Sequence, residues 1–330
     1  MPKWRPPVSR VYTVTPMRTD FGGGSVQSQV LGLVLRSSAR LVIEAWATAP
    51  SLPWPYGVVD QLGQLQRKAP GTSFGQTRIG AIRARVVRHS SARPGRHILY
   101  FHGGAFLVGG WHLHGGLLSR IAAATGATLT SVEYRQYPKH SVTQSTADGL
   151  AAYRHLLGQG VAPDEIVFMG DSAGGFLTFT VADAAREAGL PMPRALVAMS
   201  PLIDFDFIRT PIGRTRRGDH VFGPRALRTF GRVVGGAPGS VHTPVDCDLA
   251  TLPPVLLQVS SSEALYRQVA RFADLLEDAG VPTDLHVWPG QVHVFQAASV
   301  VPEAIEAVGA MAAWAERVWS SNAGAAAATA

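Results

Sequence analysis

The stretch that most constrains this chain reads IVFMGDSAGG, from residue 166 to residue 175. Its first four residues predict a buried strand, and residues 176–188 after it predict a helix. The turn between them is G-x-S-x-G, whose small glycines let the two segments approach closely. A serine on such a turn projects its hydroxyl where a base and a substrate both reach it. Although 35 glycines make chance matches common, this setting makes Ser172 a candidate nucleophile.

A second predicted strand also ends in small residues. Residues 97–105 read HILYFHGGA, so an apolar run passes directly into His102-Gly103-Gly104-Ala105. Acyl transfer places negative charge on a carbonyl oxygen, and backbone N–H groups aimed at that oxygen stabilise it. Glycines let the backbone come near enough to do so. The two stretches therefore suit the same chemistry, each at the end of a strand.

Together with the sequence GQVHVF at 290–295, these two motifs resemble the hormone-sensitive-lipase family of α/β-hydrolases, a family of carboxylesterases and lipases. The resemblance covers residues 79–319 and is weak before residue 76. It implies an α/β-hydrolase fold, no cofactor, and an oxyanion hole formed by the N–H groups of Gly103, Gly104 and Ala173. Ala105 departs from the family, which usually has a third glycine there. Its methyl group narrows the pocket and removes no donor.

A nucleophilic serine needs a histidine base and a carboxylate behind it, in the chain order Ser, Asp/Glu, His for this fold. His293 follows a strand-like run at 285–288, in a loop that can carry it over Ser172. His286 lies inside that strand, and His220 and His242 belong to a loop-rich insertion. His293 is therefore the candidate base.

The resemblance also indicates the acid. The family usually shows D-P-L-x-D at the end of the preceding strand, and here residues 259–266 read VSSSEALY. Leu265 matches the family's leucine, which puts Glu263 where the aspartate stands. A carboxylate of either kind orients the imidazole and stabilises its charged form. The competing acids precede or begin strands and are poorly placed; they are Asp246, Asp248 and Asp284.

Strand-like and helix-like segments alternate from residue 76 onward. The expected strands lie at 82–86, 97–101, 127–133, 166–169, 196–199, 255–259 and 285–288. The expected helices lie at 117–124, 145–157, 176–188, 265–276 and 302–319. Such alternation predicts the α/β class, with a mostly parallel sheet covered by helices on both faces. Active sites of such sheets lie at the carboxyl ends of the strands.

The chain is expected to form one catalytic domain, at residues 76–320, with a helical cap in two parts. The first part is residues 1–75, which show no clear strand and a helix at about 31–46. The second is a lid insertion at about 205–244, with a short helix near 225–234. Trp46 and Trp54 either lean over a pocket or pack the cap on the main domain. Residues 321–330 are expected to be a flexible tail.

The net charge of +7 is unevenly placed. Residues 1–100 hold 14 Lys/Arg and 3 Asp/Glu, or +11, whereas the remaining 230 hold 16 and 20, or −4. These arginines are scattered and no nucleic-acid motif accompanies them, so we expect no nucleic-acid partner. A solvated basic face is favoured, and weak contact with an anionic membrane surface stays open. One cysteine, Cys247, allows no disulfide within the chain, and we expect a cytoplasmic protein.

These features predict a serine hydrolase that cleaves carboxylic esters through an acyl-enzyme on Ser172. A compact cap without a long apolar lid helix favours short to medium acyl chains. We expect no metal, because His112-x-His114 has no carboxylate or thiol near it in the sequence. The alternatives are lactone or amide hydrolysis on the same machinery and a non-catalytic small-molecule binder. The presence of serine, acid and histidine together argues against the binder, and the oligomeric state is left open.

Overall fold

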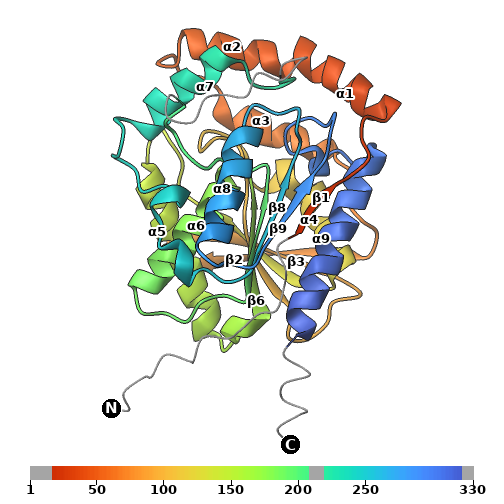
Figure 1. Ribbon diagram of the computed structural model, residues 1–330, viewed down its shortest axis with the longest axis vertical. Coiled ribbons are helices and arrows are strands. Elements are labelled where there is room, and N and C mark those ends of the chain that lie inside the picture. Colours follow the sequence, from red (N-terminus) through yellow and green to blue (C-terminus); the bar gives the residue numbers. More distant parts are fainter. Residues whose placement is uncertain (1–16, 208–218, 322–330) are drawn as a thin grey trace, which may run out of the picture.

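A nine-stranded sheet forms the centre of the computed structural model, which describes residues 17–207 and 219–321 (Figure 1). The strand order is β1-β9-β8-β7-β6-β4-β5-β3-β2. In this order, every neighbouring pair of strands from β1 through β5 is parallel. At the other edge, β3 runs antiparallel to both of its neighbours, β5 and β2. The strands are β1 (Met17–Asp20), β2 (Thr72–Ile79), β3 (Ile82–His89), β4 (His97–Phe101), β5 (Thr128–Glu133), β6 (Ile166–Asp171), β7 (Ala195–Met199), β8 (Val255–Val259) and β9 (Thr283–Val287).

The central strands are apolar because helices cover both of their faces. Every residue of β6, β7, β8 and β9 is buried. Alternate residues serve opposite faces, as the pleat of a strand requires. In β4, Leu99 and Phe101 join one apolar cluster while Ile98 and Tyr100 join another. The predicted mostly parallel sheet is confirmed.

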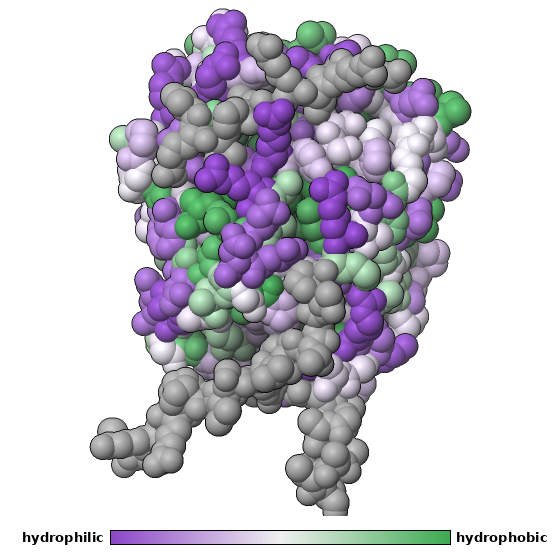
Figure 2. All heavy atoms as spheres, viewed as in Figure 1, coloured by the Kyte–Doolittle hydropathy of each residue, from purple (hydrophilic) through white to green (hydrophobic). Residues whose placement is uncertain are grey.

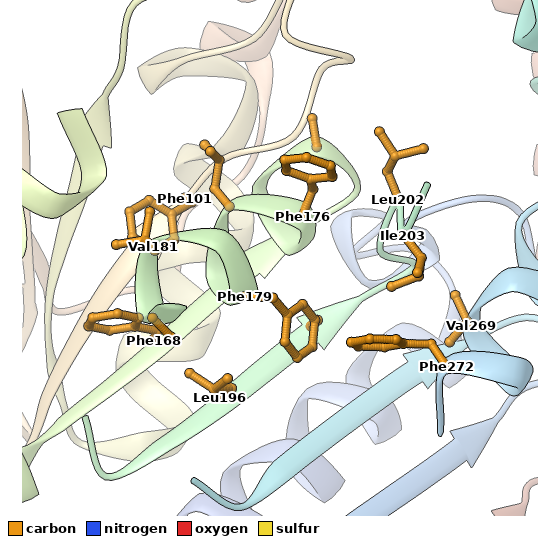
Figure 3. Packing of buried hydrophobic residues seen from close by; sticks show 14 of the residues in the cluster. Phe101, Phe168, Phe176, Phe179, Val181, Leu196, Leu202, Ile203, Val269 and Phe272 are labelled. Atoms are coloured by element: carbon orange, nitrogen blue, oxygen red, sulfur yellow. The ribbon is translucent and has the colours of Figure 1, made fainter. Parts of the chain in front are cut away.

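The helices that cover the sheet divide between its two faces. On one face lie α5 (Val142–Gly158), α6 (Ala173–Glu187) and α8 (Tyr266–Asp278), and on the other lie α4 (Trp111–Thr125) and α9 (Pro302–Ser320). In the first cluster Phe179 of α6 meets Phe272 of α8 edge to face, with ring centroids 4.9 Å apart (Figure 3). Such contacts fix both helices over the strands that carry the site.

Four short helices lie above the carboxyl ends of the strands, at the top of Figure 1. They are α1 (Val26–Ser37), α2 (Ala39–Thr48), α3 (Tyr56–Leu62) and α7 (Pro224–Phe230). Trp46 of α2 is buried within the main core, and its indole N–H donates to the Tyr56 hydroxyl at 3.1 Å. Of the two readings of Trp46, packing of the cap on the main domain is therefore the one the structure supports. Both parts of the described cap cover the strand ends.

The structure differs from the sequence expectations mainly before residue 76. Contrary to the prediction of no strand there, β1 pairs with β9 and β2 begins at Thr72. Strand β1 is short and exposed, and it is held because Phe21 beyond it stacks on Trp288 at 3.8 Å. The helix expected at 31–46 is two helices that meet at Ser38. The predicted flexible tail at residues 321–330 lies outside the described residues, except for its first residue. Residues 208–218 of the predicted lid also lie outside the described residues.

No helix in the described ranges is both long and apolar enough to cross a membrane.

Candidate active site

Ser172 occupies the sharp turn between β6 and α6. Its backbone has φ 52° and ψ −115°, a strained conformation for a residue with a side chain. The flanking glycines are required by space, because a Cβ on Gly174 would lie 1.9 Å from the Phe101 carbonyl oxygen. A Cβ on Gly170 would lie 2.3 Å from the Gly174 carbonyl oxygen. The turn therefore depends on both glycines of the sequence motif.

The structure brings Ser172, His293 and Glu263 into one hydrogen-bonded chain. His293 Nε2 lies 2.9 Å from Ser172 Oγ, and His293 Nδ1 lies 2.6 Å from Glu263 Oε2. The three residues follow β6, β9 and β8, all at the carboxyl edge of the sheet. Along the chain His293 is 121 residues from Ser172 and 30 residues from Glu263, so only the fold places the three together. The arrangement suits proton transfer from a serine hydroxyl to an imidazole oriented by a carboxylate.

Glu263 is only 1% exposed, and its second oxygen has partners of its own. Glu263 Oε1 accepts from Ser200 Oγ at 2.7 Å and from the Ser260 amide at 2.7 Å. Ser200 Oγ also accepts from the Val294 amide at 3.2 Å, next to His293. Ser200 itself adopts a positive φ of 45°, a strained conformation for serine. One serine hydroxyl therefore holds both the carboxylate and the loop that carries the histidine.

The protonation of His293 follows from these contacts. Burial alone lowers the pKa of His293, because a charged imidazole loses water, but the hydrogen bond and negative charge of Glu263 outweigh it. The net effect raises the pKa of His293 above its ordinary value. A histidine so placed is a stronger base than a free imidazole.

The loop after β4 departs from the sequence expectation at Gly103. Its N–H donates to Asp171 Oδ1 at 3.0 Å, which contradicts the prediction that Gly103 supplies an oxyanion donor. The amides of Gly104 and Ala105 have no acceptor among the described residues, and both residues have positive φ, 115° and 58°. Ala173 is the first residue of α6, so its N–H has no acceptor within the helix. The free donors at this edge are therefore Gly104, Ala105 and Ala173.

Asp171 forms a second buried pair with a histidine, which the sequence analysis did not anticipate. Asp171 Oδ2 lies 3.2 Å from His114 Nε2, and Asp171 Oδ1 also accepts from the Tyr100 hydroxyl at 2.7 Å. His114 Nδ1 faces the Gly110 carbonyl oxygen at 3.2 Å. Both ring nitrogens face oxygen atoms that can accept, an arrangement that favours the doubly protonated imidazolium form of His114.

The pKa values of this pair shift in the directions expected of an ion pair. Burial lowers the pKa of His114 by itself, but the Asp171 carboxylate raises it above its ordinary value. Burial likewise raises the pKa of Asp171 by itself, but the positive charge of His114 holds it below its ordinary value. The pair lies directly behind the Gly103 amide.

His102 braces the same loop. Its Nδ1 lies 2.8 Å from the Gly103 carbonyl oxygen, and its ring stacks on Tyr134 with centroids 4.4 Å apart. The Tyr134 hydroxyl donates to the His102 carbonyl oxygen at 2.6 Å. Burial, together with the nearby His114 charge, lowers the pKa of His102 to about 4, so it is neutral near pH 7.

One segment of the cap reaches the histidine and the acid. Asp219 Oδ2 accepts from the Ala264 amide, next to Glu263, at 2.8 Å. The Phe222 ring meets the His293 ring edge to face at 4.9 Å. Arg40 of α2 donates to the Asp219 carbonyl oxygen. Residues 219–222 therefore connect the cap to the hydrogen-bonded chain, and no sequence motif marks them.

The competing histidines and acids have other partners. His286 is buried in β9, and His242 pairs with Asp183 at 2.9 Å. Asp246 caps its own turn through Thr243, and Asp284 faces Arg317 at 3.5 Å. None of these side chains contacts Ser172 in the described part of the chain.

One cluster of described residues has the composition of a metal site. Donor atoms of Asp183, His242 and Cys247 lie within 4.8 Å of one another. However, Arg186 already pairs with Asp183 at 2.8 Å, and burial raises the pKa of the Cys247 thiol, which keeps it protonated. Because zinc prefers a thiolate, we assign no metal to this cluster.

Three phenylalanines stand beside the nucleophile. Phe106 of the loop after β4, Phe176 of α6 and Phe205 of the lid contact one another, with centroids 5.4–6.1 Å apart. Phe205 also lines a cavity of about 370 Å³ in the cap, between Phe207 and α7. Phe205 therefore contacts both that cavity and the other two rings, and none of Ser172, Glu263 and His293 lines the cavity.

Comparison with known proteins agrees with this geometry. Residues 98–297 match a family described as having the alpha/beta hydrolase fold. Esterase LipU of Mycobacterium tuberculosis is 35% identical over 285 residues, covering 82% of this chain and 96% of the relative. Carboxylesterase/phospholipase LipF of the same organism is 31% identical over 310 residues, covering 88% of this chain and 81% of the relative.

Solved structures show the same likeness. Crystals of EstE5 give a TM-score of 0.81 at 27% identity, covering 90% of this chain and all of that one. EstE7, described as a hormone-sensitive-lipase homologue from a metagenome library, gives 0.77 at 29% identity, covering 88% of this chain and 98% of that one.

Proposed function

This chain belongs to the α/β-hydrolase family, among its hormone-sensitive-lipase-like esterases, and we propose that it cleaves esters through a Ser172–His293–Glu263 triad. It is an esterase or lipase-type serine hydrolase that acts on small-molecule esters. The observation that carries the triad is the chain of short contacts, 2.9 Å from Ser172 Oγ to His293 Nε2 and 2.6 Å from His293 Nδ1 to Glu263.

The steps follow from what each group can donate or accept. His293 Nε2 takes the Ser172 proton as the oxygen attacks the ester carbonyl, and Glu263 stabilises the resulting imidazolium. The amides of Gly104, Ala105 and Ala173 donate to the oxyanion that forms. His293 then gives its proton to the departing alkoxide, which leaves an acyl-enzyme. Water attacks the acyl-enzyme with His293 again as base. The bond between Ser172 Oγ and the acyl carbon then breaks, His293 returns the proton to Ser172 Oγ, and the acid is released.

Short to medium acyl chains are the proposed substrates. The rings of Phe106, Phe176 and Phe205 pack together beside the oxyanion amides and the first turn of α6. Because Phe106 and Phe176 are fully buried, we infer that the packed rings close the far end of the acyl site and limit the length of chain that fits. The proposed preference therefore follows from the lid residue Phe205 as much as from the catalytic domain.

A panel of p-nitrophenyl esters of rising chain length tests this proposal. We expect fastest turnover at or below medium length, and faster turnover of a butyrate ester than of emulsified triolein. Faster triolein turnover would refute the chain-length proposal alone. Turnover of a lactone or an anilide but no ester would favour the alternative hydrolases, and binding without turnover of any of them would favour a non-catalytic receptor.

Phe205→Ala sharpens the same test. Removing this ring should open space between the buried rings of Phe106 and Phe176 and the 370 Å³ cavity, so the optimum should move to longer esters. Phe207→Ala is the matched control, because Phe207 lines the same cavity without a ring contact to Phe106 or Phe176. Equal shifts in both variants would show that Phe205 does not limit the chain.

A further inference from the structure

The outward side of α1 and α2 is apolar. Six of the eleven large apolar side chains exposed in the described residues lie there, with exposures of 53–72%. They are Val26, Val30, Leu33, Val34, Leu41 and Val42, which we call the outer cap face. Single exposed apolar residues are ordinary, but six within 17 residues form a patch of the kind that marks an interaction surface.

Helical spacing separates this face from the residues that pack the cap. On α1, positions 26, 30, 33 and 34 point outward, whereas Ser28 and Gly32 are buried and Leu31 packs against the core below. On α2, Trp46 and Ala47 are the buried residues. The core is thus already supplied by other side chains, and the outer cap face has no packing role within the described chain. It runs along the top edge of the molecule, where Figure 2 shows hydrophobic residues at the surface over α1 and α2.

Positive charge accompanies this face. The described cap segments, residues 17–75, 205–207 and 219–244, hold 8 Lys/Arg and 5 Asp/Glu, or +3, whereas the rest of the described chain, residues 76–204 and 245–321, holds 15 and 18, or −3. On α7, which packs against α2, Arg225 and Arg228 are exposed and have no ion-pair partner among the described residues. The whole excess of positive charge therefore lies in the cap segments.

We propose that the outer cap face docks on an anionic lipid surface. Helices that lie in a membrane interface bury an apolar side and hold cations near the headgroups, and both features are present here. A second copy of the chain fits less well, because contact between two caps would bring two positively charged surfaces together. Docking in this orientation would bring the strand ends that carry Ser172 to the side of the lipid.

Co-sedimentation with vesicles tests the proposal, with Ser172→Ala protein so that no lipid ester is cleaved. The proposal predicts binding to phosphatidylcholine vesicles that contain phosphatidylglycerol, weaker binding to phosphatidylcholine alone, and loss of the difference at about 1 M salt, where the Debye length is about 3 Å. Leu33→Gln with Leu41→Gln should weaken binding about tenfold or more. The double variant Arg225→Gln with Arg228→Gln should bind anionic vesicles roughly fivefold more weakly for each arginine removed. Its binding to phosphatidylcholine alone should not change.

Met17→Gln with Ile305→Gln is the matched control, since these side chains are 54% and 61% exposed on β1 and α9, outside the outer cap face. It should bind as the parent does, and with Ser172 restored every variant should hydrolyse a soluble ester normally. Equal binding by the Leu33/Leu41 variant and its parent would overturn the proposal, as would no binding to either vesicle. A dimer in solution that the Leu33/Leu41 substitutions dissociate would also overturn it, by assigning the face to a second copy.

Discussion

Two buried histidine–carboxylate pairs flank the nucleophile, and they differ in what the second ring nitrogen faces. His293 pairs with Glu263 through Nδ1 and presents Nε2 to the Ser172 hydroxyl. His114 pairs with Asp171 through Nε2 and presents Nδ1 to the Gly110 carbonyl oxygen. A hydroxyl both donates and accepts, whereas a carbonyl oxygen only accepts.

This difference assigns the two pairs opposite tasks. His293 can be neutral and take the serine proton, because Nε2 meets a group that can give one. The surroundings of His114 favour its doubly protonated form, so its pair with Asp171 acts as an ion pair that holds the Gly103 amide. One histidine is arranged to change its charge during the reaction, and the other is arranged to keep it.

Replacing each histidine in turn should give the largest difference between the two pairs. His293→Ala should lower kcat by about 10⁴-fold or more, because the serine loses its base. His114→Gln removes a charge that never moves, so its kcat should fall by no more than about 100-fold. Single-turnover kinetics with a p-nitrophenyl ester measure both, and equal losses would mean that the two pairs are not distinct in function.

Glu263→Gln comes next, because it keeps the shape of the acid and removes its charge. We expect kcat to fall by up to about 10⁴-fold while the fold persists. The controls are Asp246→Asn, Asp248→Asn and Asp284→Asn. The side chains of Asp246 and Asp284 have other partners, and the Asp248 backbone amide donates to Asp183. Near-normal kcat in Glu263→Gln beside a collapse in one control would reassign the acid and leave Ser172 and His293 in place.

Asp171→Asn should have a smaller effect on the rate. It leaves Ser172 and His293 untouched but weakens the hydrogen bond to the Gly103 amide, so the neighbouring oxyanion donors lose their fixed aim. A loss of about 10- to 100-fold in kcat with little change in KM is expected, since the donors matter chiefly in the transition state. A change in KM alone would indicate a role in binding substrate instead.

The smallest effect is on the pH profile of activity. The His293–Glu263 pair should set its acidic limb, and the His114–Asp171 pair should set its alkaline limb. His293 must be neutral to act, and its pKa is raised, so activity should fall with decreasing pH from a point above the ordinary histidine value of about 6.5. Glu263→Gln removes the cause of that rise, so the acidic limb of its residual activity should move to lower pH.

His114 acts in the other direction. A raised folded-state pKa means that its stabilising contribution is complete below the unfolded-state value and is lost as pH rises through the folded-state value. In the wild type, kcat and the melting temperature should therefore both decrease as the pH rises into the alkaline range. In His114→Gln that alkaline fall should be absent, and its persistence would place the titrating group elsewhere.

The sequence predicted the parts of this site that follow strand ends. Ser172, Glu263 and His293 each follow an apolar run within a few residues. Strand prediction and chain order indicated Ser172 and His293, and the family resemblance indicated Glu263. The contact of Gly103 with Asp171 was missed because it joins residues 68 positions apart through a side chain whose direction no motif states. Strand β1 was missed because its four residues are mostly polar, and its pairing with β9 is fixed by tertiary contacts.

The cap was the hardest region to predict, for a related reason. Its helices are short and carry apolar residues on two sides, so periodicity could not tell an inner face from an outer one. Asp219 and Phe222 lie in a loop without a motif and reach the triad only through the fold. The cytoplasmic location stays a prediction.

The most direct measurement of the central claim is to find where a serine-directed organophosphate attaches. The protein is treated, digested and analysed by peptide mass mapping, with Ser172→Ala as the control. The account predicts one adduct, on Ser172, formed rapidly in the wild type, absent from Ser172→Ala, and formed far more slowly in His293→Ala because the base is missing. An adduct on Ser200 or Ser261 in place of Ser172 would contradict it.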